Sequence, residues 1–136
     1  MSELKVRNLK SEAGQSLIES VLTFTMLMVI VLAVLDFSFV FQAYIGVVNA
    51  AAVGAMYGAT SQTAAYDQTG IRNAALAETN SWRCTNTTVT SSVSTDTYGF
   101  RKVSVTVSCQ VADLIAIPNS INQIVVSSTA VRRVRQ

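Results

Sequence analysis

Two carboxylates lie where their chemistry fits poorly with the residues around them. The apolar run from Leu17 to Val40 reads LIESVLTFTMLMVIVLAVLDFSFV, and its charged residues are Glu19 and Asp36. A carboxylate beside hydrocarbon is costly and usually marks a function, most simply a pairing with a cation. We therefore take Glu19 as the first candidate for a functional group. For Asp36 the simpler interpretation is that it marks the outer membrane–water boundary, and the alternative is a contact with a polar group on an adjacent helix.

The remaining reactive groups are two cysteines, since the chain has no histidine. Ser-His and Cys-His catalysis and a zinc site have nothing to build on, so we expect no enzyme, no metal and no other cofactor. Cys84 and Cys109 both follow the apolar run. In a small domain beyond a membrane segment, such a pair is typical of a disulfide formed in an oxidising compartment, with two reduced thiols as the alternative. The external acids show no recognisable pairing and are expected to be solvated: Asp67, Glu78, Asp96 and Asp113.

The charge distribution indicates a membrane protein rather than a nucleic-acid-binding one. Only 13% of the 136 residues are charged, against about 25% in ordinary soluble domains. The net charge of +2 is too small and too dispersed to indicate nucleic acid. Lys5, Arg7 and Lys10 precede the apolar run, and basic residues on a short flanking segment keep that end in the cytoplasm. The bulk of the chain then lies outside the membrane.

The element that must carry Glu19 is a long helix. Residues 17–40 supply about the 20 residues that span a bilayer core, where only a helix satisfies its own backbone. No proline interrupts residues 15–65. We therefore expect the helix to continue past the membrane length, to Ala59.

A regular row of small residues follows the membrane length. They recur every four positions, at Gly46, Ala50, Gly54 and Gly58. This spacing places them on one face of the helix and lets a second helix approach closely. The alternative is an Ala-rich helix that packs only on its own domain.

The last part of the chain predicts a short helix followed by an antiparallel sheet. We expect the helix over residues 70–80. Alternating valines in FRKVSVTVSCQV, residues 100–111, predict the clearest strand, with partners over residues 85–93 and 123–134. One face of a three-stranded sheet needs cover for its valines, which the second half of the long helix supplies. The expected fold class is α+β, a long N-terminal helix packed on a small, roughly three-stranded antiparallel sheet.

The sequence leaves one detail of this sheet open. If Cys84 lay directly opposite Cys109, then Thr88 and Thr90 would face the core and Val89 would face solvent. A disulfide just before the first strand, or a bulge within it, would remove the conflict.

Three interpretations of the start of the chain compete. The first is an uncleaved signal anchor with Glu19 near the membrane edge. The second is a secretory signal peptide cut after Ala52, which fits poorly because Asp36 and some sixteen further residues separate that cut from the apolar core. The third is a cut after Gly14, which would remove a polar cytoplasmic head and make Gln15 the new amino terminus.

The row GQSLIE, Gly14 to Glu19, resembles the prepilin peptidase site of type IV pilin-like proteins. The sequence is most similar to the TadE-like minor pilins of tight-adherence (Tad, or Flp) pili. Asp36 and Phe37 end the apolar run, and aromatic residues and a Gly- and Ala-rich segment follow, in the order found in that family. The early helix proline and the Gly-Arg pair common in the family are absent here.

The resemblance implies a structural subunit of a surface filament that serves adherence. A prepilin peptidase would cut after Gly14, so that residues 1–14 are a leader, residues 15–41 the transmembrane and filament-core half of the helix, and residues 42–136 an extracytoplasmic domain. The positive amine of Gln15 would then need a partner in an apolar bundle. Glu19 of the adjacent subunit can supply it and fix the axial register. The small-residue row would take part in assembly.

The implied partners are the prepilin peptidase, other pilin subunits, an inner-membrane assembly machinery and, before assembly, membrane lipid, with no nucleic acid expected. The precursor would be a single-pass protein of the bacterial inner membrane with a cytoplasmic N-terminus, and the mature subunit would join an extracytoplasmic or cell-surface filament. Two alternatives stay open. One is an uncleaved single-pass membrane protein whose external sheet is a binding module, and the other is a major rather than a minor filament subunit.

Overall fold

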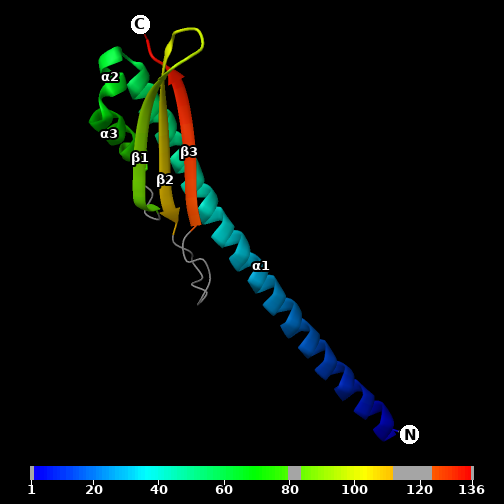
Figure 1. Cartoon of the computed structure of the whole chain (residues 1–136). Helices are drawn as coiled ribbons and strands as arrows, with labels where there is room; N and C mark the ends of the chain where they lie inside the picture. Colours follow the sequence, from blue (N-terminus) through cyan, green and yellow to red (C-terminus); the bar gives the residue numbers. More distant parts are fainter. Residues whose placement is uncertain (1, 80–83, 112–123, 136) are drawn as a thin grey trace. The chain divides into compact units, whose positions relative to one another are not determined.

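The structure of the chain is a computed structural model that describes residues 2–79, 84–111 and 124–135, with side chains from Gly14 onward. Its elements are α1 (Ser2–Ala59), α2 (Gln62–Tyr66), α3 (Gln68–Glu78), β1 (Cys84–Thr95), β2 (Arg101–Val111) and β3 (Ile124–Arg133) (Figure 1). The chain divides into two compact units, Met1–Phe37 and Ser38–Gln136, and α1 contributes to both. The α+β class predicted from the sequence is confirmed.

The first unit is the N-terminal part of α1. Every side chain from Gly14 to Leu35 is exposed, although most of them are apolar. By length and composition, α1 is long and apolar enough to cross a membrane. Apolar side chains that the subunit leaves uncovered require another apolar surrounding, which lipid or neighbouring helices can supply. The predicted helix end at Ala59 is confirmed, and the helix begins earlier than expected, at Ser2.

The second unit contains a three-stranded antiparallel sheet in the order β1-β2-β3 (Figure 1). The central strand, β2, alternates regularly: its valines and Cys109 are buried, and the residues between them are partly exposed. The flanking strands pair with β2 along nearly their whole length. All three predicted strands are present, with β1 running two residues further than expected, to Thr95.

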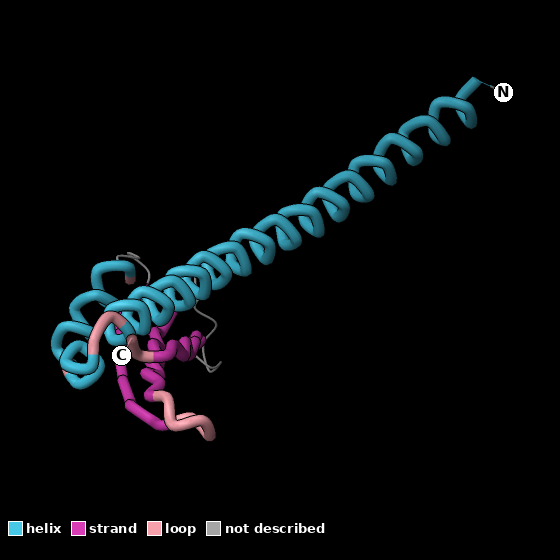
Figure 2. The backbone as a smooth tube through the Cα atoms, turned by 90° about the horizontal axis from the view of Figure 1, so that it is seen from above, coloured by secondary structure: helices cyan, strands magenta, loops and turns pink. Residues whose placement is uncertain are grey.

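Helices cover one face of this sheet (Figure 2). The C-terminal part of α1 contributes small buried side chains, among them Ala43, Val47 and Ala55, and α3 adds Ile71 and Ala75. These side chains form one core with the inward valines of β2. The predicted cover of the valine face by the second half of the long helix agrees with this packing.

Two short helices connect α1 to the sheet. The five residues of α2 were not predicted, because so short a segment shows no apolar period. α3 begins two residues earlier than predicted because the Asp67 carboxylate caps it, accepting the Gly70 backbone N–H at 2.9 Å and the Tyr57 hydroxyl at 3.0 Å. These two bonds lower the pKa of Asp67 below its usual value. The predicted helix end at residue 80 lies outside the described residues.

A β-bulge in β1 resolves the conflict around the cysteines. Cys84 and Cys109 form a disulfide with their Cα atoms 5.6 Å apart. Cys84 pairs with Val111, and the register then shifts between Thr85 and Thr88, so that two residues of β1 face one residue of β2. Within the bulge, Asn86 adopts a positive φ of 51°, which asparagine tolerates better than most residues. After the shift Val89 packs against the core, as its apolar side chain requires.

Candidate functional site

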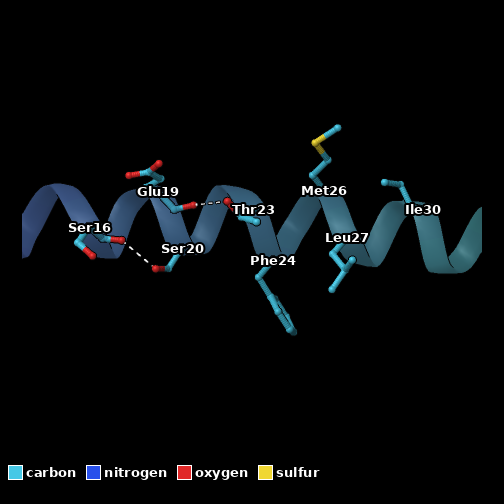
Figure 3. Close-up of a pocket in the computed structure, with 8 residues that line it drawn as sticks. All are labelled: Ser16, Glu19, Ser20, Thr23, Phe24, Met26, Leu27 and Ile30. Atoms are coloured by element: carbon cyan, nitrogen blue, oxygen red, sulfur yellow. Dashed lines mark hydrogen bonds between the residues drawn. The ribbon is translucent and has the colours of Figure 1, made fainter.

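Glu19 lies on the exposed apolar surface of α1, two residues after Leu17. Its side chain extends from the same side of the helix as Met26 and Ile30 (Figure 3). All three border a shallow depression that is lined by this one helix. Among the residues whose side chains are described, none donates a hydrogen bond or forms an ion pair with the Glu19 carboxylate. A cation from outside this part of the chain can therefore pair with the Glu19 carboxylate.

The hydroxyl groups beside Glu19 bond to their own helix. Ser20 and Thr23 each donate to the backbone carbonyl four residues earlier, at 2.9 Å (Figure 3). Thr25 repeats the arrangement at 2.8 Å. Such bonds satisfy a hydroxyl inside an apolar medium without any outside partner. The Glu19 carboxylate differs from these neighbouring hydroxyls in that none of the described side chains of its helix pairs with it.

Gly14 and Gln15 occupy exposed positions one helical turn before Glu19. A Cβ added at Gly14 would meet no atom within 4 Å, so the described packing does not require glycine there. Glycine inside a helix costs about 1 kcal/mol relative to alanine. Processing after Gly14 stays a prediction.

The members of the small-residue row lie in different surroundings. Ala50, Gly54 and Gly58 are buried in the core of the second unit. A Cβ at Gly54 would stand 3.2 Å from both Ala75 and Val105, so packing inside the subunit already explains the small size of this residue. Gly46 is half-exposed with open space around it. The role of the row in assembly stays a prediction.

Asp36 lies at the end of the exposed segment and is half-buried, unlike the side chains immediately before it. A half-buried position agrees with a residue at the membrane–water boundary and also with a residue that contacts an adjacent helix. Both interpretations stay predictions.

The comparison with known proteins concerns the same stretch of α1. Residues 14–56 match the family model described as TadE-like protein. The chain carries a TadE-like segment. The similarity predicted from the row GQSLIE and the residues after it is confirmed. No curated protein and no solved structure matches the chain.

The TadE-like segment begins at Gly14 and ends within α1, so the sheet lies outside it. It contains Glu19, Asp36 and all of the small-residue row except Gly58. A TadE-like segment on an apolar N-terminal helix fits a membrane-anchored, pilin-like component of a Tad pilus.

Outside the TadE-like segment, sequence reasoning missed the partners of Asp96. Its carboxylate lies 2.9 Å from Lys102 Nζ and 3.0 Å from Arg133 Nη2. The bond to Lys102, then the backbone N–H of Thr97, and then Arg133 hold the pKa of Asp96 at about 2, below its usual 3.8. Asp96 therefore joins the β1–β2 turn to the end of β3 and is not simply solvated as expected.

The other external acids give no sign of a reactive site. Glu78 is exposed, and Asp113 lies outside the described residues. Within the described ranges, no group of three or more His, Cys, Asp or Glu side chains is placed to hold a metal ion.

Asp96→Asn is expected to lower the melting temperature by a few degrees at neutral pH. Because folding depresses the pKa of Asp96, its contribution to stability is complete above 3.8 and disappears as the pH falls through about 2. The difference from wild type should therefore shrink as the pH is lowered from 4 to 2. Thermal melting followed by circular dichroism measures this, with Glu78→Gln, which removes an exposed carboxylate of α3, as the control variant. A difference that is independent of pH would contradict the assignment.

Proposed function

We propose that this chain is a minor structural subunit of a Tad-type, type IV pilin-like surface filament that serves adherence. The observation that carries the proposal is the TadE-like match at residues 14–56. It coincides with a helix whose apolar side chains the subunit leaves uncovered. Membrane lipid covers these side chains before assembly, and the helices of neighbouring subunits cover them afterwards.

Processing after Gly14 is the first step of this proposal. A prepilin peptidase removes residues 1–14 on the cytoplasmic side and leaves Gln15 with a free α-amine. Two observations support the position: the TadE-like match begins at Gly14, and no described packing contact accounts for a glycine there. The basic residues of the leader favour a cytoplasmic N-terminus.

Glu19 then acts as a registry residue. The new amine would be a lone charge in an apolar helix bundle, where an unpaired charge is very costly. The exposed carboxylate of Glu19 on the adjacent subunit accepts it and fixes the axial offset between the two helices. Within the small-residue row, the open space around Gly46 makes it the member best suited to an intersubunit contact.

The mass of the protein recovered from its native host tests the proposal. We expect the chain to begin at Gln15 in a strain that has the matching prepilin peptidase, and to retain residues 1–14 in a strain that lacks it. A Gly14→Phe variant in the first strain is the matched control, because a Cβ at this position meets no described atom within 4 Å and the large side chain should block the cut. Retention of the leader in both strains would reject the filament proposal.

That second result would favour the alternative, an uncleaved single-pass membrane protein with an external binding sheet. The same exposed helix would then be a plain anchor, and Glu19 would lie near the membrane edge. Abundance in sheared surface fibres would in turn distinguish a major from a minor filament subunit.

A further inference from the structure

Two short basic motifs, thirty residues apart in the chain, are brought together by the register of the sheet. One is FRK at residues 100–102 and the other is VRRVR at residues 131–135. Lys102 pairs with Arg133 and Val103 with Arg132 across β2 and β3. The Val134 backbone N–H also donates to the Arg101 carbonyl at 2.9 Å. Neighbouring strands are about 4.8 Å apart, so both motifs lie at one end of the sheet. Lys102 and Arg133 are on its outer face, whereas Arg132, which pairs with the buried Val103, is on the helix-covered side.

This end of the sheet, which we call the basic pole, holds five of the six basic residues in the described part of the second unit. It consists of Arg101, Lys102, Arg132, Arg133 and Arg135. Asp96 is the carboxylate that the described structure pairs with these cations. The pole therefore has a formal charge of +4, against +2 for the whole chain. Among the described residues, the side chains of Arg132 and Arg135 form no hydrogen bond or ion pair.

Aromatic rings accompany the cations. The Arg101 guanidinium lies over the Tyr66 ring, 6.0 Å from its centroid, and the Arg133 guanidinium lies 5.0 Å from that of Phe100. Tyr98, at the tip of the β1–β2 turn, is 80% exposed. A polar depression of about 210 Å³ lies between Arg101 and Arg135. The pole thus combines positive charge, a recess and rings that can stack on a ligand.

Hydroxyl groups continue from the pole along the outer face of the sheet. Ser94 pairs with Lys102 across β1 and β2. The next pair on the same face, further from the pole, is Ser92 with Ser104. Further along, the Thr88 and Ser108 hydroxyls are 2.6 Å apart, and those of Thr106 and Thr129 are 2.8 Å apart. This face can exchange hydrogen bonds with a ligand that itself carries many hydroxyls.

The pole also adjoins the end of α1. The backbone N–H of Arg135 donates to the Ala59 carbonyl at 2.9 Å.

We propose that the basic pole binds an anionic polysaccharide, with carboxylates on the arginines, sugar rings on the tyrosines and sugar hydroxyls on the serine rows. Double-stranded DNA fits less well, because it presents one charge per roughly 1.7 Å and its binders usually neutralise six to ten phosphates. A polyuronate carries one charge on each sugar and offers hydroxyls between the charges. The inference extends the adherence proposed above, but it concerns the single subunit and is tested without filament assembly.

The test uses the full chain in a non-ionic detergent and measures its affinity for alginate, a polyuronate, with neutral dextran and double-stranded DNA as comparison polymers. We expect alginate to bind more tightly than either, and its affinity to fall several-fold when NaCl is raised from about 50 to about 200 mM. Replacing Arg132 and Arg135, in Arg132→Gln/Arg135→Gln, should weaken alginate binding about tenfold. Tyr98→Ala should weaken it several-fold, and its exposed side chain makes unfolding no concern.

Arg72→Gln is the matched control, because Arg72 is an exposed cation on α3 that lies outside the pole. It should leave the affinity for alginate unchanged. Alginate binding no tighter than dextran binding, or equal losses from Arg72→Gln and from the double variant, would overturn the proposal. Tighter binding to DNA than to alginate would overturn it as well and would assign the pole to nucleic acid.

Discussion

Glu19→Ala is expected to leave membrane insertion intact and to reduce incorporation into filaments by roughly 100- to 5,000-fold. Insertion should survive because removing a carboxylate from an apolar run makes the run more favourable in lipid. Incorporation should fail because the Gln15 amine of the neighbouring subunit would lose its partner. Breaking a buried charge pair on one side costs about 3–5 kcal/mol, since the other charge stays buried and unpaired.

The measurement compares the amount of the variant in membranes with the amount in sheared filaments. Ser20→Ala is the matched control, because the Ser20 hydroxyl bonds only to its own helix at 2.9 Å, and this variant should be incorporated normally. Glu19→Gln separates charge from hydrogen bonding: a loss as large as that of alanine indicates an ion pair. Normal incorporation of Glu19→Ala would show that the carboxylate has no registry role.

Much of the fold could be predicted because single strong patterns specify it. In β2, alternation of buried and half-exposed residues runs without interruption from Val103 to Val111, and a period of two has one structural solution. The end of α1 at Ala59 lies close to the end of the apolar, Gly- and Ala-rich stretch. The disulfide followed from two cysteines in a small external domain.

The bulge in β1 shows where pattern alone was insufficient. The sequence revealed that Cys84 and Val89 could not both be placed by one regular register. It did not choose between a disulfide ahead of the strand and a bulge inside it, because both keep Val89 in the core. The choice depends on the local conformation of Asn86, whose side chain also donates to Gln110 at 2.8 Å.

The small-residue row shows a different limit. A spacing of four places Gly54 and Gly58 on one helix face, but it does not say what approaches that face. In the subunit, Val105 and Val103 and the side chains of α3 do so. The same glycine spacing serves a helix pair and a helix on a sheet equally well, because both need only a close backbone approach.

The candidate functional residues also differ in whether the sequence alone could predict them. The local row from Gly14 to Glu19 was readable because all of its members lie within two turns of one helix. Asp96 and the basic pole were missed because their members meet only through strand register: Arg133 reaches Asp96 across 37 residues of sequence. The signal that was available, two clusters of arginine and lysine flanking two predicted neighbouring strands, becomes informative only when the strands are known to be antiparallel.

Replacing both cysteines, in Cys84→Ala/Cys109→Ala, is expected to lower the free energy of unfolding of the second unit by about 3 kcal/mol. The bridge spans 25 residues, and opening a loop of that size restores conformational entropy to the unfolded chain. The unit has a small core, and ordinary domains of this kind are stable by only about 5–15 kcal/mol. Urea unfolding in detergent, followed by the fluorescence of the single tryptophan, measures the difference.

Wild-type protein treated with dithiothreitol is the matched control, because it loses the cross-link and keeps every side chain. It should unfold close to the double alanine variant, which additionally loses the buried packing of Cys109. If only the alanine variant were destabilised, the effect would come from packing and not from the cross-link. An unfolding midpoint equal to that of the oxidised protein in both cases would contradict the role of the bridge. That outcome would mean that the bulge and the ladder between β1 and β2 hold this edge of the sheet without it.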